Sequence, residues 1–314
     1  MPAALPKPSF GGLLTQWSFE PIAVVAAVAL AFWYFRAVRA TDAWPIRRSI
    51  GFAAGLVLLV WSACGFLEVY RRAQFWVWTT QALVLWLAVP LVLLAGRPVH
   101  LAMQRSGPDS RLMRALRSPV CKVLANPLVG PALVPLLSAV LFFGPLPGWA
   151  TDSDAVAWLL QTLLVVIGAL ILLPLVGLDD GSSSLAVGLS LAIGMFELVL
   201  DAVPGIVLRL NTHVTTSYFA HADKHPWTLG RLHDQHVAGS IVWIIAEVID
   251  LPFLLLVFRR WVRVDAREAA AVDAILDAER IARGEPAANE DETARDAPWW
   301  LTDPAMQQRF KRGG

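Results

Sequence analysis

Cysteine is scarce in this chain, with only Cys64 and Cys121 among 314 residues and no CxxC pair. The sequence also lacks an internal repeat and a glycine loop of the kind that cradles phosphate. Charged residues make up only 16% of it, and the formal net charge of +1 gives no indication of nucleic-acid binding. These absences exclude the sequence signatures of a dithiol redox site, a nucleotide-binding loop and a repeat protein.

Apolar residues, in contrast, account for 56% of the chain, and the mean hydropathy is +0.56. A helix needs roughly 20 mostly apolar residues to cross a bilayer. Seven runs qualify, at about 21–38, 49–68, 75–95, 127–144, 155–177, 183–205 and 237–258. The runs are continuous rather than alternating, which favours helices over strands. We therefore predict an all-α polytopic membrane protein with seven transmembrane helices. The first run lacks a following small-residue cleavage site and is interpreted as a span.

Lysine and arginine predict the orientation, because cytoplasmic segments carry an excess of them. With the N-terminus outside and the C-terminus cytoplasmic, 20 of the 26 basic residues lie inside. Residues 1–262 then form the transmembrane domain of a multi-pass protein in a plasma membrane, of bacterial type. Residues 263–314 form a cytoplasmic amphipathic helix, a polar linker and a peptide containing Trp299 and Trp300. Cys64 and Cys121 fall on opposite faces of the membrane, which excludes a disulfide between them.

Five of the six histidines lie in the segment 213–239, between the last two predicted spans. Helix spacing places Glu197 and Asp201 on one face of the sixth span and Glu247 inside the seventh. Mixed imidazole and carboxylate sets bind Zn²⁺ or Cu²⁺. We therefore predict a metal site on the outer side, and copper or zinc as its ion. The candidate ligands are His233, His236, His221, His225, His213, Glu197, Asp201 and Glu247.

Two simpler interpretations of these residues stay open. The histidines are solvated loop residues in the first, and the acids are neutral or hydrogen-bonded to tryptophan and hydroxyl groups. In the second, Arg209 pairs with Asp201 and neutralises one acid.

The segment LHDQHVAGSIVW (232–243) resembles the start of the last helix in the cytochrome c oxidase assembly factors of the CtaG type. VPLVLLAGRPV (89–99) and ANPLVGPAL (125–133) are similar to two further segments of that family. The resemblance covers about 20–260. It implies a non-enzymatic protein that assists copper insertion into a haem–copper oxidase or scaffolds its assembly. The implied partners are terminal oxidase subunits, membrane lipid and a copper-carrying protein on the outer side.

The chain departs from that family at its intramembrane histidines. Trp78 and Ala82 stand where the family has two histidines four residues apart, and Gln161 stands at a third. Copper handling would then depend on the loop histidines and the acids of the last two spans.

Two functions of other classes compete with assembly. An intramembrane metal-dependent hydrolase would use a Zn²⁺-bound water with Glu197 or Asp201 as the general base. A proton-coupled transporter would use Glu197, Asp201 and Glu247 as a relay, although no inverted repeat or pair of broken helices is visible.

Overall fold

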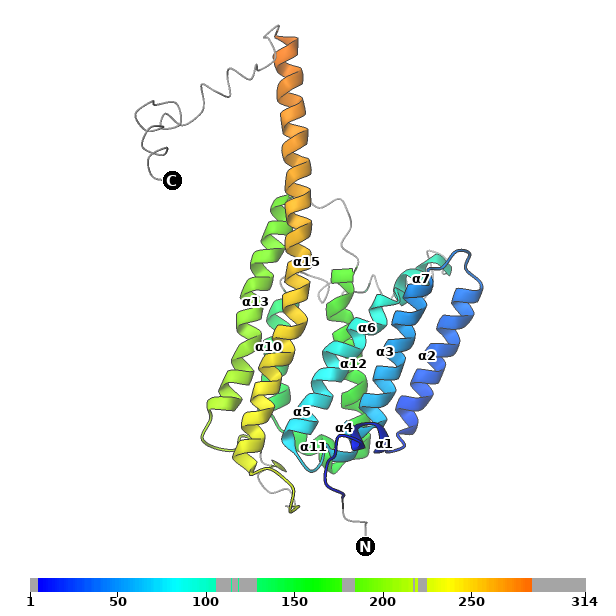
Figure 1. Ribbon diagram of the computed structural model, residues 1–314, viewed down its shortest axis with the longest axis vertical. Helices are drawn as coiled ribbons and strands as arrows, with labels where there is room; N and C mark the ends of the chain where they lie inside the picture. Colours follow the sequence, from blue (N-terminus) through cyan, green and yellow to red (C-terminus); the bar gives the residue numbers. More distant parts are fainter. Residues whose placement is uncertain are drawn as a thin grey trace, which may run out of the picture. The chain divides into compact units, whose positions relative to one another are not determined.

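The described part of the chain is helical throughout. A computed structural model describes residues 5–105, 114, 118, 129–176, 184–216, 218, 219 and 225–283, and no strand occurs in them. The chain divides into two units, Met1–Phe258 and Arg259–Gly314. Figure 1 shows the helices of the chain. In the second unit the described residues are helical and mostly exposed. The predicted linker, Trp299 and Trp300 lie outside the described residues.

The helices follow the apolar runs of the sequence. The elements are α1 (Gly12–Thr15), α2 (Pro21–Arg39), α3 (Ile46–Cys64), α4 (Phe66–Tyr70), α5 (Phe75–Leu83), the π-helix η1 (Val84–Ala88), α6 (Val89–Ala95), α7 (Pro98–Arg105), α10 (Val129–Phe143), α11 (Leu146–Asp152), α12 (Asp154–Val176), α13 (Ser184–Leu210) and α15 (Arg231–Ala282). The all-α prediction is confirmed.

Within the described residues, five helical stretches are long and apolar enough to cross a membrane: Pro21–Arg39, Ile46–Tyr70, Phe75–Ala95, Asp154–Leu172 and Val187–Leu210. The pair Leu133–Phe143 and Leu146–Asp152, bent by 56°, makes a sixth if it is counted as one span. Proline explains the bend, because Pro145 and Pro147 follow Gly144 and offer no N–H to continue the helical ladder. The predicted seventh span falls within α15. The protein is thus a membrane protein, while the count of seven and the orientation stay predictions.

Close backbone packing holds the spans together, as is common between membrane helices. A Cβ at Gly168 of α12 would lie 1.8 Å from the Trp86 carbonyl oxygen of η1. A Cβ at Gly205 of α13 would lie 2.7 Å from the Gly239 carbonyl oxygen of α15. The absence of a side chain at these positions lets α12 meet η1 and α13 meet α15 at backbone distance.

Aromatic stacking connects α2 to α3 and to the turn after α6. The rings of Tyr34 and Phe52 stack at 3.8 Å, and the Tyr34 hydroxyl donates to the Gly96 carbonyl oxygen at 2.8 Å. The indole N–H of Trp44 donates to the same hydroxyl at 3.1 Å. The buried Tyr34 therefore fixes the turn contained in the segment 89–99.

Cys64 is a buried free cysteine. Cys121 lies outside the described residues.

Candidate functional site

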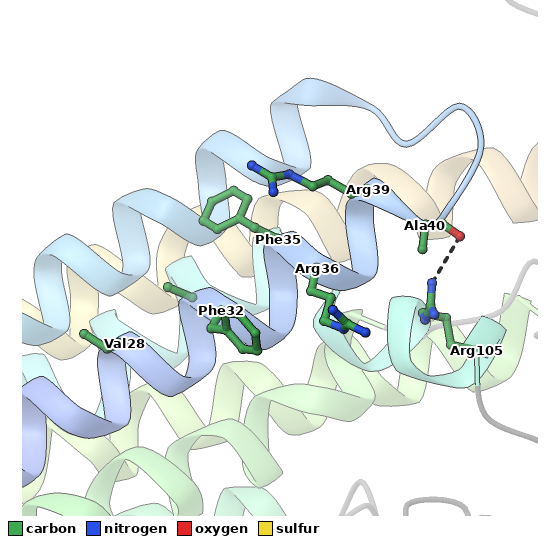
Figure 2. Close-up of a pocket in the computed structure, with 8 residues that line it drawn as sticks. Val28, Phe32, Phe35, Arg36, Arg39, Ala40 and Arg105 are labelled. Atoms are coloured by element: carbon green, nitrogen blue, oxygen red, sulfur yellow. Dashed lines mark hydrogen bonds between the residues drawn. The ribbon is translucent and has the colours of Figure 1, made fainter.

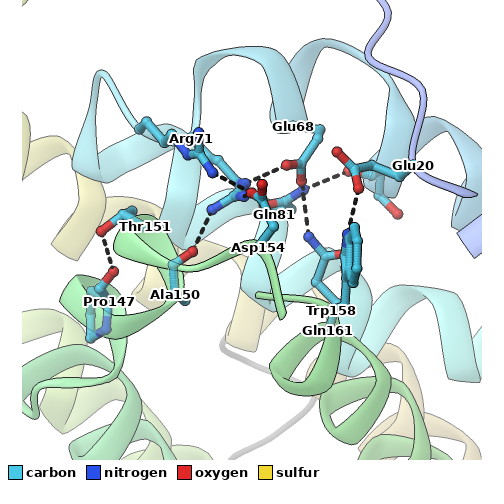
Figure 3. A network of polar contacts seen from close by, with 12 residues as sticks. Glu20, Glu68, Arg71, Gln81, Pro147, Ala150, Thr151, Asp154, Trp158 and Gln161 are labelled. Atoms are coloured by element: carbon cyan, nitrogen blue, oxygen red, sulfur yellow. Dashed lines mark hydrogen bonds and ion pairs between the residues drawn. The ribbon is translucent and has the colours of Figure 1, made fainter. Parts of the chain in front are cut away.

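A buried carboxylate lies at the centre of a polar network between α4, α5 and α12 (Figure 3). The Glu68 side chain is 5% exposed and pairs with the guanidinium of Arg71, one turn further along the chain. Its other oxygen accepts from Gln81 Nε2 at 2.7 Å and from Gln161 Nε2 at 2.9 Å. Three donors from three elements therefore converge on one carboxylate.

The guanidinium of Arg71 contacts two further elements. Its Nη1 donates to the Ala150 carbonyl oxygen of α11 at 2.8 Å, and its Nη2 lies 3.7 Å from an Asp154 oxygen. Arg72 pairs with the same Asp154 oxygen at the surface. Because a buried ion pair is tolerated only when its remaining hydrogen-bonding groups are also satisfied, this network determines how α4, α5, α11 and α12 meet.

A small cavity of about 20 Å³, room for about one water molecule, adjoins this network. Arg71, Gln81, Trp78, Ala82 and Gln161 all contribute to its lining. The last three are the positions at which the resembling family carries histidines, and the fold brings them to one cavity although they lie far apart in the sequence.

The residues around this cavity do not fit a copper ion. Its described lining consists of a guanidinium, two primary amides, an indole and aliphatic groups, with no imidazole, thiol or thioether. Copper sites in proteins are built mainly from those three ligand types, with carboxylate oxygens in some Cu²⁺ sites, and the described lining contains no carboxylate either. The guanidinium supplies the positive charge that balances Glu68 instead.

Outside the cavity, the described histidines near the C-terminal end of α13 and the N-terminal end of α15 are spread among separate contacts. His213 Nδ1 lies 3.0 Å from Thr212 Oγ1, and the His225 ring stacks on Trp227 with 5.0 Å between centroids. His233 is exposed in the first turn of α15. His236 is half-buried beside it.

The predicted acids are placed as follows. Asp201 is buried on α13, and Glu247 accepts a hydrogen bond of 2.9 Å from the indole N–H of Trp243. Arg209 donates to Ser240 Oγ. His221 and the Glu197 side chain lie outside the described residues.

Within the described ranges, no three His, Cys, Asp or Glu side chains lie close enough together to hold a metal ion. Since two of the eight predicted ligands are not described, the metal site stays a prediction.

Two residues of the segment 232–243 have structural roles that the sequence did not indicate. Asp234, at the start of α15, accepts from the backbone N–H groups of Phe75 at 2.8 Å and Trp76 at 2.9 Å. It therefore caps the N-terminus of α5, where the helix dipole favours an anion. Burial nevertheless raises the pKa of Asp234 to about 6, against the opposing effect of these two N–H groups and of His233.

Gln235 ties the loop after α13 to α15. Its amide oxygen accepts from the backbone N–H of Thr215 at 2.7 Å, and its amide nitrogen donates to the carbonyl oxygens of Leu208 at 3.2 Å and His213 at 3.0 Å. The side chain is fully enclosed. The pattern LHDQHVAG is thus explained by capping, loop anchoring and the backbone contact of Gly239.

The comparisons with known proteins can be set beside this geometry. The family described as "Cytochrome c oxidase caa3 assembly factor (Caa3_CtaG)" matches residues 11–264. Uncharacterized proteins of Mycobacterium leprae and Mycobacterium tuberculosis are 26% and 27% identical to the chain, over 87% and 88% of its length. The chain spans only 44% of the length of each of these relatives. No solved structure matches the chain.

Proposed function

The chain belongs to the family of cytochrome c oxidase caa3 assembly factors, and from this premise we propose that it assists the assembly of a terminal oxidase in a plasma membrane. The family match is the observation that carries the proposal. It covers 254 residues, counted from 11 to 264, and so includes both the polar network and the segment 232–243. Because the chain spans less than half of its relatives' length, the same function for a longer protein that contains this chain is likewise a proposal.

Scaffolding is the mode that the network supports better than copper insertion. Glu68 is already paired with Arg71 and accepts hydrogen bonds from two amides, so the cavity offers no lone carboxylate to a metal ion. A fully hydrogen-bonded network resists rearrangement, because leaving any of its buried groups unpaired is costly. We propose that it holds one end of the helix bundle rigid, as a surface against which an oxidase subunit is held during assembly.

Copper handling through the histidine segment is the second candidate, favoured by one contact. His236 Nε2 lies 3.0 Å from the Asn211 carbonyl oxygen, which can only accept a hydrogen bond. The ring therefore donates from Nε2, and Nδ1 keeps its lone pair in the neutral form. Histidines that bind metals are held in this way by a carbonyl or carboxylate behind the ring.

A strain that lacks the protein distinguishes the two modes. Scaffolding predicts that membranes of this strain contain less oxidase and less of its subunits, and that copper added to the medium does not restore them. Copper insertion predicts apo-oxidase at normal subunit levels, with activity rising when copper is supplied. Normal oxidase activity in the deletion strain, with or without added copper, would overturn the assembly proposal itself.

The orientation can be tested separately with single cysteines in a Cys64→Ala/Cys121→Ala background. A cysteine at Thr228 should react with an impermeant thiol reagent in intact cells, whereas one at Asp277 should react only after lysis. The opposite pattern would place the histidine segment on the cytoplasmic side.

A further inference from the structure

The last three turns of α2 border an open groove that the assembly function does not use (Figure 2). The groove has a volume of about 670 Å³. It is lined by Val28, Ala31, Phe32, Phe35, Arg36, Arg39, Ala40 and Arg105.

The lining changes character along the helix. Val28 and Phe32 lie further from the C-terminal end of α2 and are 62% and 70% exposed. Arg36 and Arg39 lie in its last turn, and Arg105 reaches the same end from α7. The groove is therefore apolar along its length and cationic at one end.

The length of α2 places the cationic end at the surface of the bilayer. Its 19 residues extend about 28 Å at 1.5 Å per residue, close to the roughly 30 Å of the hydrocarbon layer. When the apolar part of α2 lies in hydrocarbon, the arginines lie among the lipid headgroups. In the predicted orientation these are the headgroups of the cytoplasmic leaflet.

Arg105 is held in position at this end of the groove. Its Nη1 donates to the Ala40 carbonyl oxygen at 3.1 Å and to the Ala37 carbonyl oxygen at 3.4 Å (Figure 2). These bonds satisfy carbonyl groups at the C-terminus of α2, where a cation is also favoured by the helix dipole. The guanidinium is thereby fixed at the C-terminal end of α2, in the groove that Arg36 and Arg39 also line.

No carboxylate balances this charge in the described part of the chain. The ion pairs there join Glu68 to Arg71 and Asp154 to both Arg71 and Arg72, and they do not include Arg36, Arg39 or Arg105. These three arginines at headgroup depth therefore offer positive charge to an anion in the membrane surface.

We propose that the groove is a binding site for an anionic phospholipid of the phosphatidylglycerol class. Guanidinium groups bind phosphate oxygens through paired, charge-assisted hydrogen bonds. In a zwitterionic headgroup, the lipid's own cation offsets the negative charge of the phosphate and weakens this attraction. One acyl chain would lie along Val28, Phe32 and Phe35. The bound lipid would join α2 to α7, independently of whether the protein assembles an oxidase.

Lipid retention on the purified full chain tests this proposal. The protein is exchanged into a neutral detergent, supplied with dioleoyl phosphatidylglycerol or dioleoyl phosphatidylcholine, and the bound lipids are counted by native mass spectrometry. We expect one phosphatidylglycerol to be retained at concentrations at which phosphatidylcholine is lost. Arg36→Gln/Arg39→Gln should weaken this binding about 25-fold, because each arginine near an anionic surface contributes about a factor of five.

A matched control removes the same charge elsewhere on the predicted cytoplasmic side. Arg47→Gln/Arg267→Gln replaces two exposed arginines outside the groove and should retain phosphatidylglycerol as the wild type does. Phe32→Ala should weaken the binding of both phosphatidylglycerol and phosphatidylcholine. Glycerol 3-phosphate alone should not displace the bound lipid. Equal loss in the two double variants, or unchanged binding in Arg36→Gln/Arg39→Gln, would overturn the proposal. Displacement by glycerol 3-phosphate would reduce the site to a phosphate site and overturn the role of the acyl chain.

Discussion

Two adjacent arginines allow the energy of the buried network to be measured against an exposed reference. Arg71 pairs with Glu68 where both side chains are at most 5% exposed, whereas Arg72 pairs with Asp154 where they are 49% and 62% exposed. Removing one partner of a buried pair leaves an uncompensated charge and costs about 3–5 kcal/mol. An exposed pair contributes only about 0–1 kcal/mol.

These values convert into a difference in melting temperature. A loss of 1 kcal/mol lowers the Tm of a 150–250-residue domain by roughly 2–4 °C. We expect Arg71→Met to lower the Tm by roughly 6–20 °C and Arg72→Met by at most about 4 °C. The measurement is tryptophan fluorescence during heating of the protein in detergent micelles.

A double variant separates charge imbalance from simple loss of contacts. Glu68→Gln/Arg71→Met removes both charges, so it should be less destabilised than the sum of the two single variants. The Arg71→Met effect should therefore shrink when Glu68 is already neutral. Equal Tm losses for Arg71→Met and Arg72→Met, or strict additivity in the double variant, would refute the reasoning that Glu68 and Arg71 act as a buried charged pair.

Three further predictions concern other parts of the fold. Because burial raises the pKa of Asp234 to about 6, its folded carboxyl group binds a proton more tightly than the unfolded one. Its contribution to stability should be complete below about pH 4 and decline by about 3 kcal/mol as the pH rises through 6, and Asp234→Asn should abolish this slope in pH-dependent unfolding. Gly168→Ala should lower the free energy of unfolding by about 1–3 kcal/mol, because its Cβ would collide with a backbone carbonyl. Gly230 has open space around it, so Gly230→Ala should leave the stability unchanged in the same thermal unfolding experiment. Equal effects of the two variants would contradict the packing at Gly168. If copper is handled by the histidine segment, calorimetric titration should show Cu²⁺ binding that weakens below about pH 6.5 and is lost in His233→Ala/His236→Ala; unchanged binding in that variant would place the metal elsewhere.

The sequence sufficed to predict the helical class and the positions of most spans, because continuous apolar runs of membrane length have few other solutions. It did not predict the 56° bend at Gly144, although the following prolines could have indicated a break. The apolar run over 75–95 also predicted one regular helix, whereas the structure has a π-turn in its middle. Hydropathy reports burial and length, and neither property changes at a π-turn.

The site was harder to predict because its charges come from segments that look ordinary in the sequence. Glu68 and Arg71 lie at the end of an apolar run, and their role becomes visible only when α5 and α12 bring Gln81 and Gln161 to them. The histidine site was predicted because five histidines lie close together in the sequence, and closeness in the sequence says little about distances between side chains in the fold. Family resemblance was the better guide, since its departures at Trp78, Ala82 and Gln161 converge on one cavity.

The π-turn η1 also determines how the helical stretch Phe75–Ala95 can tolerate a change in its number of residues. A π-turn holds one residue more than the α-helical turn it replaces and takes it up within that turn, so α5, which carries Gln81, keeps the phase of a regular helix relative to α6, which packs against α3 and α12. Deleting one residue within Val84–Ala88 should therefore restore a regular turn and leave Gln81 facing Glu68. A second inserted residue would no longer fit in the widened turn and would rotate Gln81 by about 100° relative to α6. The side chain would then leave Glu68 although no residue of the network had changed. This helix should therefore tolerate the loss of one residue at η1 better than the gain of one.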